Sequence, residues 1–133
     1  MSDVLRFTIP GKPEYVQMVR LAIASIAGKA DFDVDAVEDI KEAMAEACKI
    51  VFCHGSAGFS DCYEILCEID DASMTITASD TCRAQDLVKG NKPCCKCPDE
   101  GNIAVAVMES LMDNVELNLD DDGNKIIRMV KSK

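Results

Sequence analysis

The chain has 133 residues, and its size, composition and charge exclude several classes of protein. Hydrophobic residues make up 48 % and charged residues 29 %, a globular composition, so we expect one domain over residues 1–133. The net charge of −10 repels phosphate backbones and anionic lipid surfaces. We therefore expect no nucleic-acid or membrane partner, and a basic protein surface becomes the plausible target.

The first residues, MSDVLRFTIPGKP, contain no apolar run of signal-peptide length, and no window reaches the length of a membrane span. We therefore expect a cytoplasmic protein. In that reducing compartment, the eight cysteines are expected to act as small hydrophobic residues or free thiols rather than as a disulfide framework.

The first half of the chain predicts one strand and two helices. Residues 5–9 alternate in polarity and predict a short strand. Pro13 suits the first turn of a helix, whose apolar residues recur at helical spacing up to Gly28, the predicted stop. A second helix is predicted over residues 35–53. Its apolar stripe comprises Val37, Ile40, Met44, Ala47 and Val51.

The middle of the chain predicts two strands followed by a long loop. Residues 62–69 and 73–79 alternate in polarity, and the tight connection Asp70-Asp71 joins them. Residues 80–101 are irregular and contain clustered cysteines. Because long loops inside small domains are usually functional or mobile, this stretch is a candidate site region.

The last part of the chain predicts a helix and a hairpin. The helix is expected over residues 103–112, and the hairpin pairs residues 115–119 with 125–130 across an Asp-Gly turn. The resulting order is strand-helix-helix-strand-strand-helix-strand-strand. Adjacent hairpins with few crossovers predict an α+β fold with a mostly antiparallel sheet covered on one face by helices.

Methionines and cysteines outside the long loop are predicted to pack in the core. The methionines at core-like spacing are Met18, Met44, Met74, Met108, Met112 and Met129. The corresponding cysteines are Cys48, Cys53, Cys62 and Cys67.

Three stretches of the sequence resemble one known family. They run from Pro13 to Leu21, from Glu42 to Cys48, and from Val107 to Asp113. On these stretches the chain resembles the anti-sigma-factor serine kinases (RsbW/SpoIIAB type) of the histidine-kinase-like, or GHKL, ATPase superfamily. The resemblance implies the superfamily's fold, a sigma factor or an anti-anti-sigma factor as partner, and a homodimer.

The resemblance also implies where a nucleotide site would lie on the second helix. The family carries a Glu that polarises the attacking hydroxyl or water, and an Asn four residues later that holds magnesium. Glu46 matches the Glu, but Ile50 stands where the Asn is expected. An isoleucine side chain has no oxygen ligand to offer magnesium. His54, which ends this helix in the family pattern, is retained.

The family's two glycine boxes are only partly retained. Asp80 matches the Asp that accepts a hydrogen bond from adenine, but Cys82 replaces the following Gly. Gly101 survives at the second box, while Asn102 and Ala104 replace the next two glycines. Because each added Cβ narrows a phosphate cradle, we expect a degenerate site. ATP or ADP binding should be weak or absent, and magnesium should not be bound.

The family grips its protein partner with the first helix and the adjoining surface. Arg20 matches an Arg that family members present to their partners, and Glu14 and Tyr15 lie in the same matched stretch. The resemblance therefore implies a partner-binding surface formed by these residues. The simpler interpretation is an exposed helix arginine paired with an acidic neighbour.

Three functions follow, and the first is our leading hypothesis. It is an anti-sigma-factor-like regulator that sequesters its partner with a weakened kinase site. The second is an active serine/threonine kinase with Glu46 as base, Asp80 on adenine and Glu42 as substitute metal ligand. The third is a thiol- or zinc-dependent sensor. Its candidate ligands are Cys82, Cys94, Cys95 and Cys97, whose spacing departs from paired C-x₂-C motifs, so a metal site is not favoured.

Overall fold

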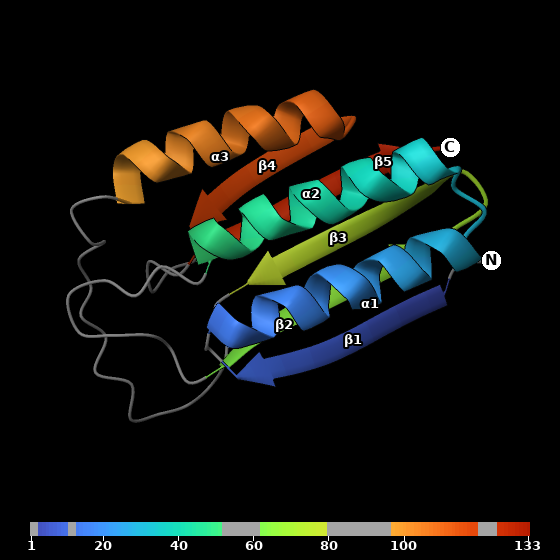
Figure 1. Cartoon of the computed structure of the whole chain (residues 1–133), viewed down its shortest axis with the longest axis horizontal. Coiled ribbons are helices and arrows are strands. Elements are labelled where there is room, and N and C mark those ends of the chain that lie inside the picture. The colour runs from blue at the N-terminus through green and yellow to red at the C-terminus, as the bar shows by residue number, and fades with distance from the viewer. Residues whose placement is uncertain (1–2, 11–12, 52–61, 80–96, 120–124) are drawn as a thin grey trace.

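The computed structural model describes residues 3–10, 13–51, 62–79, 97–119 and 125–133 (Figure 1). These residues form five β-strands, three α-helices and a 3₁₀ turn. In chain order the elements are β1 (Asp3–Pro10), η1 (Pro13–Tyr15), α1 (Val16–Lys29), α2 (Val34–Val51), β2 (Cys62–Ile69), β3 (Ser73–Ser79), α3 (Cys97–Leu111), β4 (Asn114–Leu119) and β5 (Lys125–Ser132). The predicted order of strands and helices is confirmed.

The described strands pair antiparallel in one sheet with the order β1-β2-β3-β5-β4. The register sets apolar residues opposite each other, as for Ile65 and Ala78, or Ile76 and Met129. Because side chains alternate along a strand, this register places them all on one face. The alternation that predicted these strands is therefore the pattern that builds the core-facing side of the sheet.

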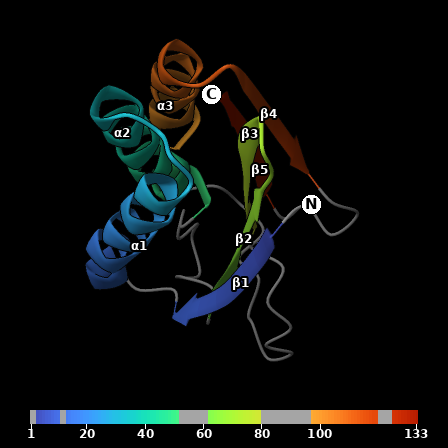
Figure 2. The ribbon, with the colours of Figure 1, turned by 90° about the vertical axis from the view of Figure 1, so that its right-hand side faces the viewer.

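The three described α-helices lie side by side on one face of the sheet, with α2 between α1 and α3 (Figures 1 and 2). The core fills the space between the two layers. Its fully buried members include Ile23 of α1, Ile40 and Met44 of α2, Met108 of α3, and Ile76 and Met129 of the sheet. Each such side chain stabilises the fold by roughly 1.5–3 kcal/mol on burial. None of the described helices is long and apolar enough to cross a membrane.

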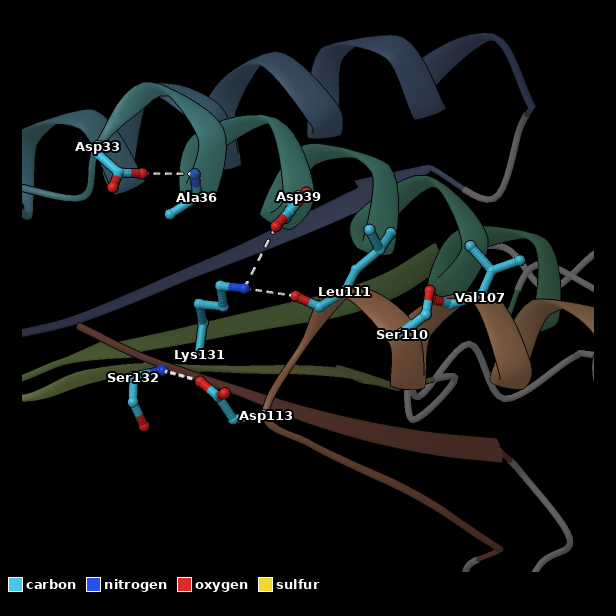
Figure 3. Close-up of polar contacts among 9 residues, drawn as sticks. All are labelled: Asp33, Ala36, Asp39, Val107, Ser110, Leu111, Asp113, Lys131 and Ser132. Atoms are coloured by element: carbon cyan, nitrogen blue, oxygen red, sulfur yellow. Dashed lines mark hydrogen bonds and ion pairs between the residues drawn. The ribbon is translucent and has the colours of Figure 1, made fainter.

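The ends of α1 and α2 meet at a short connection whose chemistry differs from the prediction. Gly28 was expected to stop the first helix, but α1 continues to Lys29. The left-handed residue that turns the chain is Asp31, with φ of 68°. Asp33 then caps α2, because its Oδ1 accepts a hydrogen bond from Ala36 N at 2.8 Å (Figure 3).

The C-terminal strand is joined to α2 and to the end of α3 by Lys131 (Figure 3). Its Nζ donates a hydrogen bond to the carbonyl oxygen of Leu111 at 2.6 Å and lies 3.5 Å from Asp39 Oδ2. Next to it, Ser132 N donates to Asp113 Oδ2 at 2.6 Å. These contacts connect β5 to α2 and to the C-terminal end of α3, the end of that helix opposite to Gly101.

The third helix begins earlier than predicted. It was expected from residue 103, whereas α3 begins at Cys97 and includes Pro98 and Gly101. Proline is tolerated in the first turn of a helix, where its missing N–H would be unpaired in any case. Gly101 therefore lies inside the helix rather than ahead of it.

The core prediction for the methionines is confirmed for five and wrong for one. The confirmed residues are Met44, Met74, Met108, Met112 and Met129, all buried. Met18 is 60 % exposed, because α1 buries the stripe through Val19, Ile23 and Ala27. Position 18 lies on the far side of the helix from that stripe.

Candidate functional site

Arg20 of α1 and Glu42 of α2 form an ion pair that bridges the two helices. Arg20 Nη2 donates a hydrogen bond to Glu42 Oε1 at 2.8 Å. Arg20 Nη1 donates to Gln17 Oε1 at 3.1 Å. Gln17 lies one turn before Arg20, where side chains on a helix are neighbours. The guanidinium group is therefore held between its own helix and α2.

The Arg20–Glu42 pair lies at the surface, but the Nε atom of Arg20 is buried. The Arg20 side chain is 25 % exposed and that of Glu42 is 55 % exposed. Arg20 Nε is buried and has no hydrogen-bond partner among the described residues. Because an unpaired buried donor is unfavourable, this arginine is not optimally paired.

The thiol of Cys48 is buried in the core on the same helix as Glu42. Burial raises the pKa of Cys48 to about 12, and the positive charge of Arg20 opposes this shift only in part. Burial likewise raises the pKa of Cys67 to about 12, with the charge of Glu68 adding to the effect. Both side chains are fully buried in the core, which confirms their predicted role as packing residues. Cys53 lies outside the described residues, as does the side chain of Cys62.

Two apolar side chains lie one turn apart on the outward side of α1, away from its buried stripe. Met18 is 60 % exposed and Leu21 is 55 % exposed. Of the other predicted partner residues, Glu14 is exposed on η1, whereas Tyr15 is half-buried and packs against the core. The structure thus places Arg20 and Glu14 at the surface and shows that Met18 and Leu21 are exposed as well.

Helix α2 carries the catalytic candidate. Glu46 lies one turn after Glu42 and one turn before Ile50, and all three have helical backbones. Glu46 is half-buried, while the side chain of Ile50 lies outside the described residues. The family's spacing of four helical residues between the Glu position and the Asn position is therefore present on α2. Position 50, however, carries an isoleucine instead of the asparagine that would bind a metal.

The described residues do not fit a magnesium ion. Magnesium takes hard oxygen ligands, and an isoleucine at position 50 has none. The carboxylate of Glu42, the substitute ligand of the kinase hypothesis, already binds Arg20 at 2.8 Å. Within the described ranges, no group of three or more His, Cys, Asp or Glu residues could hold a metal ion.

The start of α3 differs from a glycine-rich phosphate cradle. Gly101 and Asn102 lie inside the helix that begins at Cys97. Only the first four N–H groups of a helix lack intrahelical acceptors, so the backbone N–H groups at these two positions bond within α3. Ala104 is 2 % exposed and belongs to the core. A helix N-terminus open to phosphate is thus not found at Gly101.

The remaining nucleotide and zinc candidates cannot be placed. His54, Asp80, Cys82, Cys94 and Cys95 lie outside the described residues. Cys97 begins α3, but its side chain also lies outside the described part of the chain. The adenine contact and the zinc-binding hypothesis stay predictions.

A family model and several known proteins match this chain, and they indicate the same family. The family model described as "Histidine kinase-like ATPase domain" matches residues 9–131. The serine-protein kinase RsbW of Halalkalibacterium halodurans is 31 % identical, over 97 % of this chain and 83 % of its own length. The RsbW proteins of Bacillus licheniformis and Listeria monocytogenes serotype 4a are each 30 % identical, over 90 % and 91 % of this chain and 80 % and 83 % of their own.

A solved structure shows the same fold. The crystal structure of the RsbU and RsbW domains of Rv1364c from Mycobacterium tuberculosis superposes with a TM-score of 0.70 at 14 % identity, over 97 % of this chain. The present chain spans 31 % of that longer one. The family is shown by the match over residues 9–131 and by the identity of 30–31 % to the RsbW proteins. The chain belongs to the histidine kinase-like ATPase domain family and, within it, to the family of the serine-protein kinase RsbW.

Proposed function

We propose that the protein is an anti-sigma-factor-like regulator that binds a sigma factor or an anti-anti-sigma factor, and that its ATP and magnesium site is weakened or lost. One observation carries each half of the proposal. Arg20 lies partly exposed at the junction of α1 and α2, and the outward side of the same helix carries the exposed Met18 and Leu21. The α2 position that would hold magnesium in the family is instead Ile50.

The α1 surface has the composition of a protein-binding site. Arginine is enriched among the residues that dominate binding energy at interfaces, and methionine is enriched at interfaces generally. The exposed Met18 and Leu21, one turn apart on α1, supply apolar contact area that a partner can cover. The net charge of −10 suits a partner whose surface is basic overall.

The nucleotide half of the proposal is tested by calorimetric titration with ATP and ADP, each with and without magnesium. We expect weak binding or none, and no gain from magnesium, because position 50 lacks a metal ligand. Micromolar binding that requires magnesium would overturn this half. It would mean that another residue replaces the missing asparagine.

The partner half is tested with purified sigma factors and anti-anti-sigma proteins of the source organism. Titration of each against the wild-type chain should identify one that binds. Arg20→Ala should then weaken binding at least tenfold. Lys29→Ala is the matched control, because it removes one positive charge from the last turn of the same helix. Equal effects of the two variants would overturn the assignment of Arg20.

An active serine kinase is the second candidate, because Glu46 is retained half-buried on α2 and the relatives are named serine-protein kinases. The two functions separate in one assay. Radiolabelled ATP is incubated with the chain and an anti-anti-sigma protein, with wild type compared with Glu46→Gln. If the chain is a regulator without kinase activity, the anti-anti-sigma protein stays unlabelled with both wild type and Glu46→Gln. Labelling that Glu46→Gln abolishes would establish the kinase.

A further inference from the structure

We infer that Glu42 is an intramolecular competitor for the carboxylate that a protein partner presents to Arg20, so that Glu42 sets the affinity of the α1 surface. The inference rests on the proposed function, which supplies a partner bound through Arg20. It adds the chemistry of the contact. In the free protein the acceptor on Arg20 is the carboxylate of Glu42, and in the complex it is a carboxylate of the partner.

The geometry of the free-state pair leaves room for this exchange. Arginine binds a carboxylate most strongly when two parallel N–H groups meet its two oxygens. Here Nη2 donates to Glu42 Oε1 at 2.8 Å, while Nη1 donates to the neutral amide oxygen of Gln17 at 3.1 Å. A carboxylate that engages both Nη atoms would replace one charged and one neutral acceptor. The incoming group is therefore the stronger acceptor.

The Arg20–Glu42 pair lies where a partner's carboxylate can reach it. Glu42 is 55 % exposed, and exposed ion pairs contribute little net stability. The unpaired Nε of Arg20 also favours the exchange of acceptors. Outward movement of the guanidinium would expose this buried donor to an acceptor or to water and so relieve the cost of leaving it unpaired.

A matched control lies one turn earlier on the same helix. Glu38 is 58 % exposed and pairs with Lys41 Nζ at 3.1 Å. Glu38→Ala removes the same charge from the same surface without touching Arg20. Any effect of Glu42→Ala that Glu38→Ala lacks is therefore specific to the Arg20 pair rather than to net charge.

The test measures partner affinity for wild type, Glu42→Ala, Glu38→Ala, Arg20→Ala and the double variant of residues 20 and 42. The probe is the protein that binds wild type in the titration above. We expect Glu42→Ala to tighten binding about threefold, as the small energy of an exposed pair implies. Glu38→Ala should leave affinity unchanged. In the Arg20→Ala background, Glu42→Ala should have no effect, because no competition is left.

The outcomes separate the two proposals. If Arg20→Ala does not weaken binding, the proposed partner surface is wrong. If Arg20→Ala weakens binding but Glu42→Ala does not tighten it beyond Glu38→Ala, the partner surface stands and the competitor role is overturned.

A second readout needs no partner. Phenylglyoxal modifies accessible arginines, and mass spectrometry locates the product. Modification of Arg20 should be about threefold faster in Glu42→Ala than in wild type or Glu38→Ala, since an exposed pair of this kind retards access only slightly. Arg6 and Arg128 are exposed and serve as internal standards. Equal rates at Arg20 in all three proteins would overturn the inference.

Discussion

Lys131 Nζ donates a hydrogen bond to the carbonyl oxygen of Leu111 at 2.6 Å, at the C-terminal end of α3 (Figure 3). Carbonyl groups in the last turn of a helix have no intrahelical donor, and the helix dipole favours a cation there. Lys131 supplies both the donor and the charge from a neighbouring strand. Its side chain is only 16 % exposed, so water replaces it poorly.

Replacement of this lysine should therefore destabilise the fold. Lys131→Met keeps the aliphatic stem but leaves the Leu111 carbonyl and the Asp39 carboxylate without their donor. We expect a loss of about 1–3 kcal/mol in the free energy of unfolding, measured by urea denaturation. Arg128→Met, an exposed cation on the same strand, should change it by less than about 0.5 kcal/mol. Equal losses in the two variants would contradict the capping role.

Gly28→Ala should stabilise the protein. Gly28 is helical within α1, and a Cβ built there meets no atom within 4 Å. Alanine restricts the unfolded chain and favours the helix, so we expect a gain of about 0.4–1 kcal/mol by urea denaturation. Asp31→Ala provides the contrast, because position 31 has a positive φ that alanine adopts poorly. A loss of stability in Gly28→Ala would show that the glycine has a packing role.

The Asp33 cap offers a third test. Asp33→Ala removes the acceptor for Ala36 N and should lower the free energy of unfolding by about 1 kcal/mol. Asp33→Ser retains a capping oxygen and should recover most of that loss. Asp35→Ala removes a charge from the first turn of α2 without removing the cap. If Asp35→Ala had the larger effect, charge at the helix N-terminus rather than the hydrogen bond would explain the result.

The fold was predictable because most elements have a strong period. The alternation in residues 62–69 and 73–79 fixed β2 and β3, and the apolar stripe of residues 35–53 fixed the body of α2. Boundaries were less predictable where local signals conflict. Pro98 and Gly101 both indicated a loop, yet α3 begins at Cys97 and includes them. Helix packing against α2 outweighs these weak local preferences.

The candidate site was predictable only in part. The family resemblance pointed to Arg20, Glu46 and Ile50, and helical spacing correctly placed the last two on one helix. The simpler interpretation of Arg20, a pair with an acidic neighbour, is confirmed, but which acid it pairs with was not predictable. Gln17 is a neighbour by spacing, but Glu42 comes from another helix, and its contact depends on how α1 packs on α2. The exposure of Met18 likewise depends on which face of α1 the sheet covers.

Alkaline pH should destabilise the protein through its buried thiols. Burial raises the pKa of Cys48 and of Cys67 from the ordinary value of 9.0 to about 12. Because the folded-state pKa lies above the unfolded one, folding favours the neutral thiol. This contribution is fully present below pH 9 and is lost as the pH rises through about 12.

The matched comparison is wild type against a variant with both Cys48→Ala and Cys67→Ala, unfolded with urea at several pH values from 8 to 11. Every other titrating group is common to the two proteins, so it cancels in their difference. The variant should be less stable at pH 8, because both side chains are fully buried and alanine leaves space. Above pH 9 its disadvantage should shrink, since only wild type gains from thiolate formation in the unfolded state. A stability difference that stayed constant up to pH 11 would mean that these thiols ionise alike in the folded and unfolded chain.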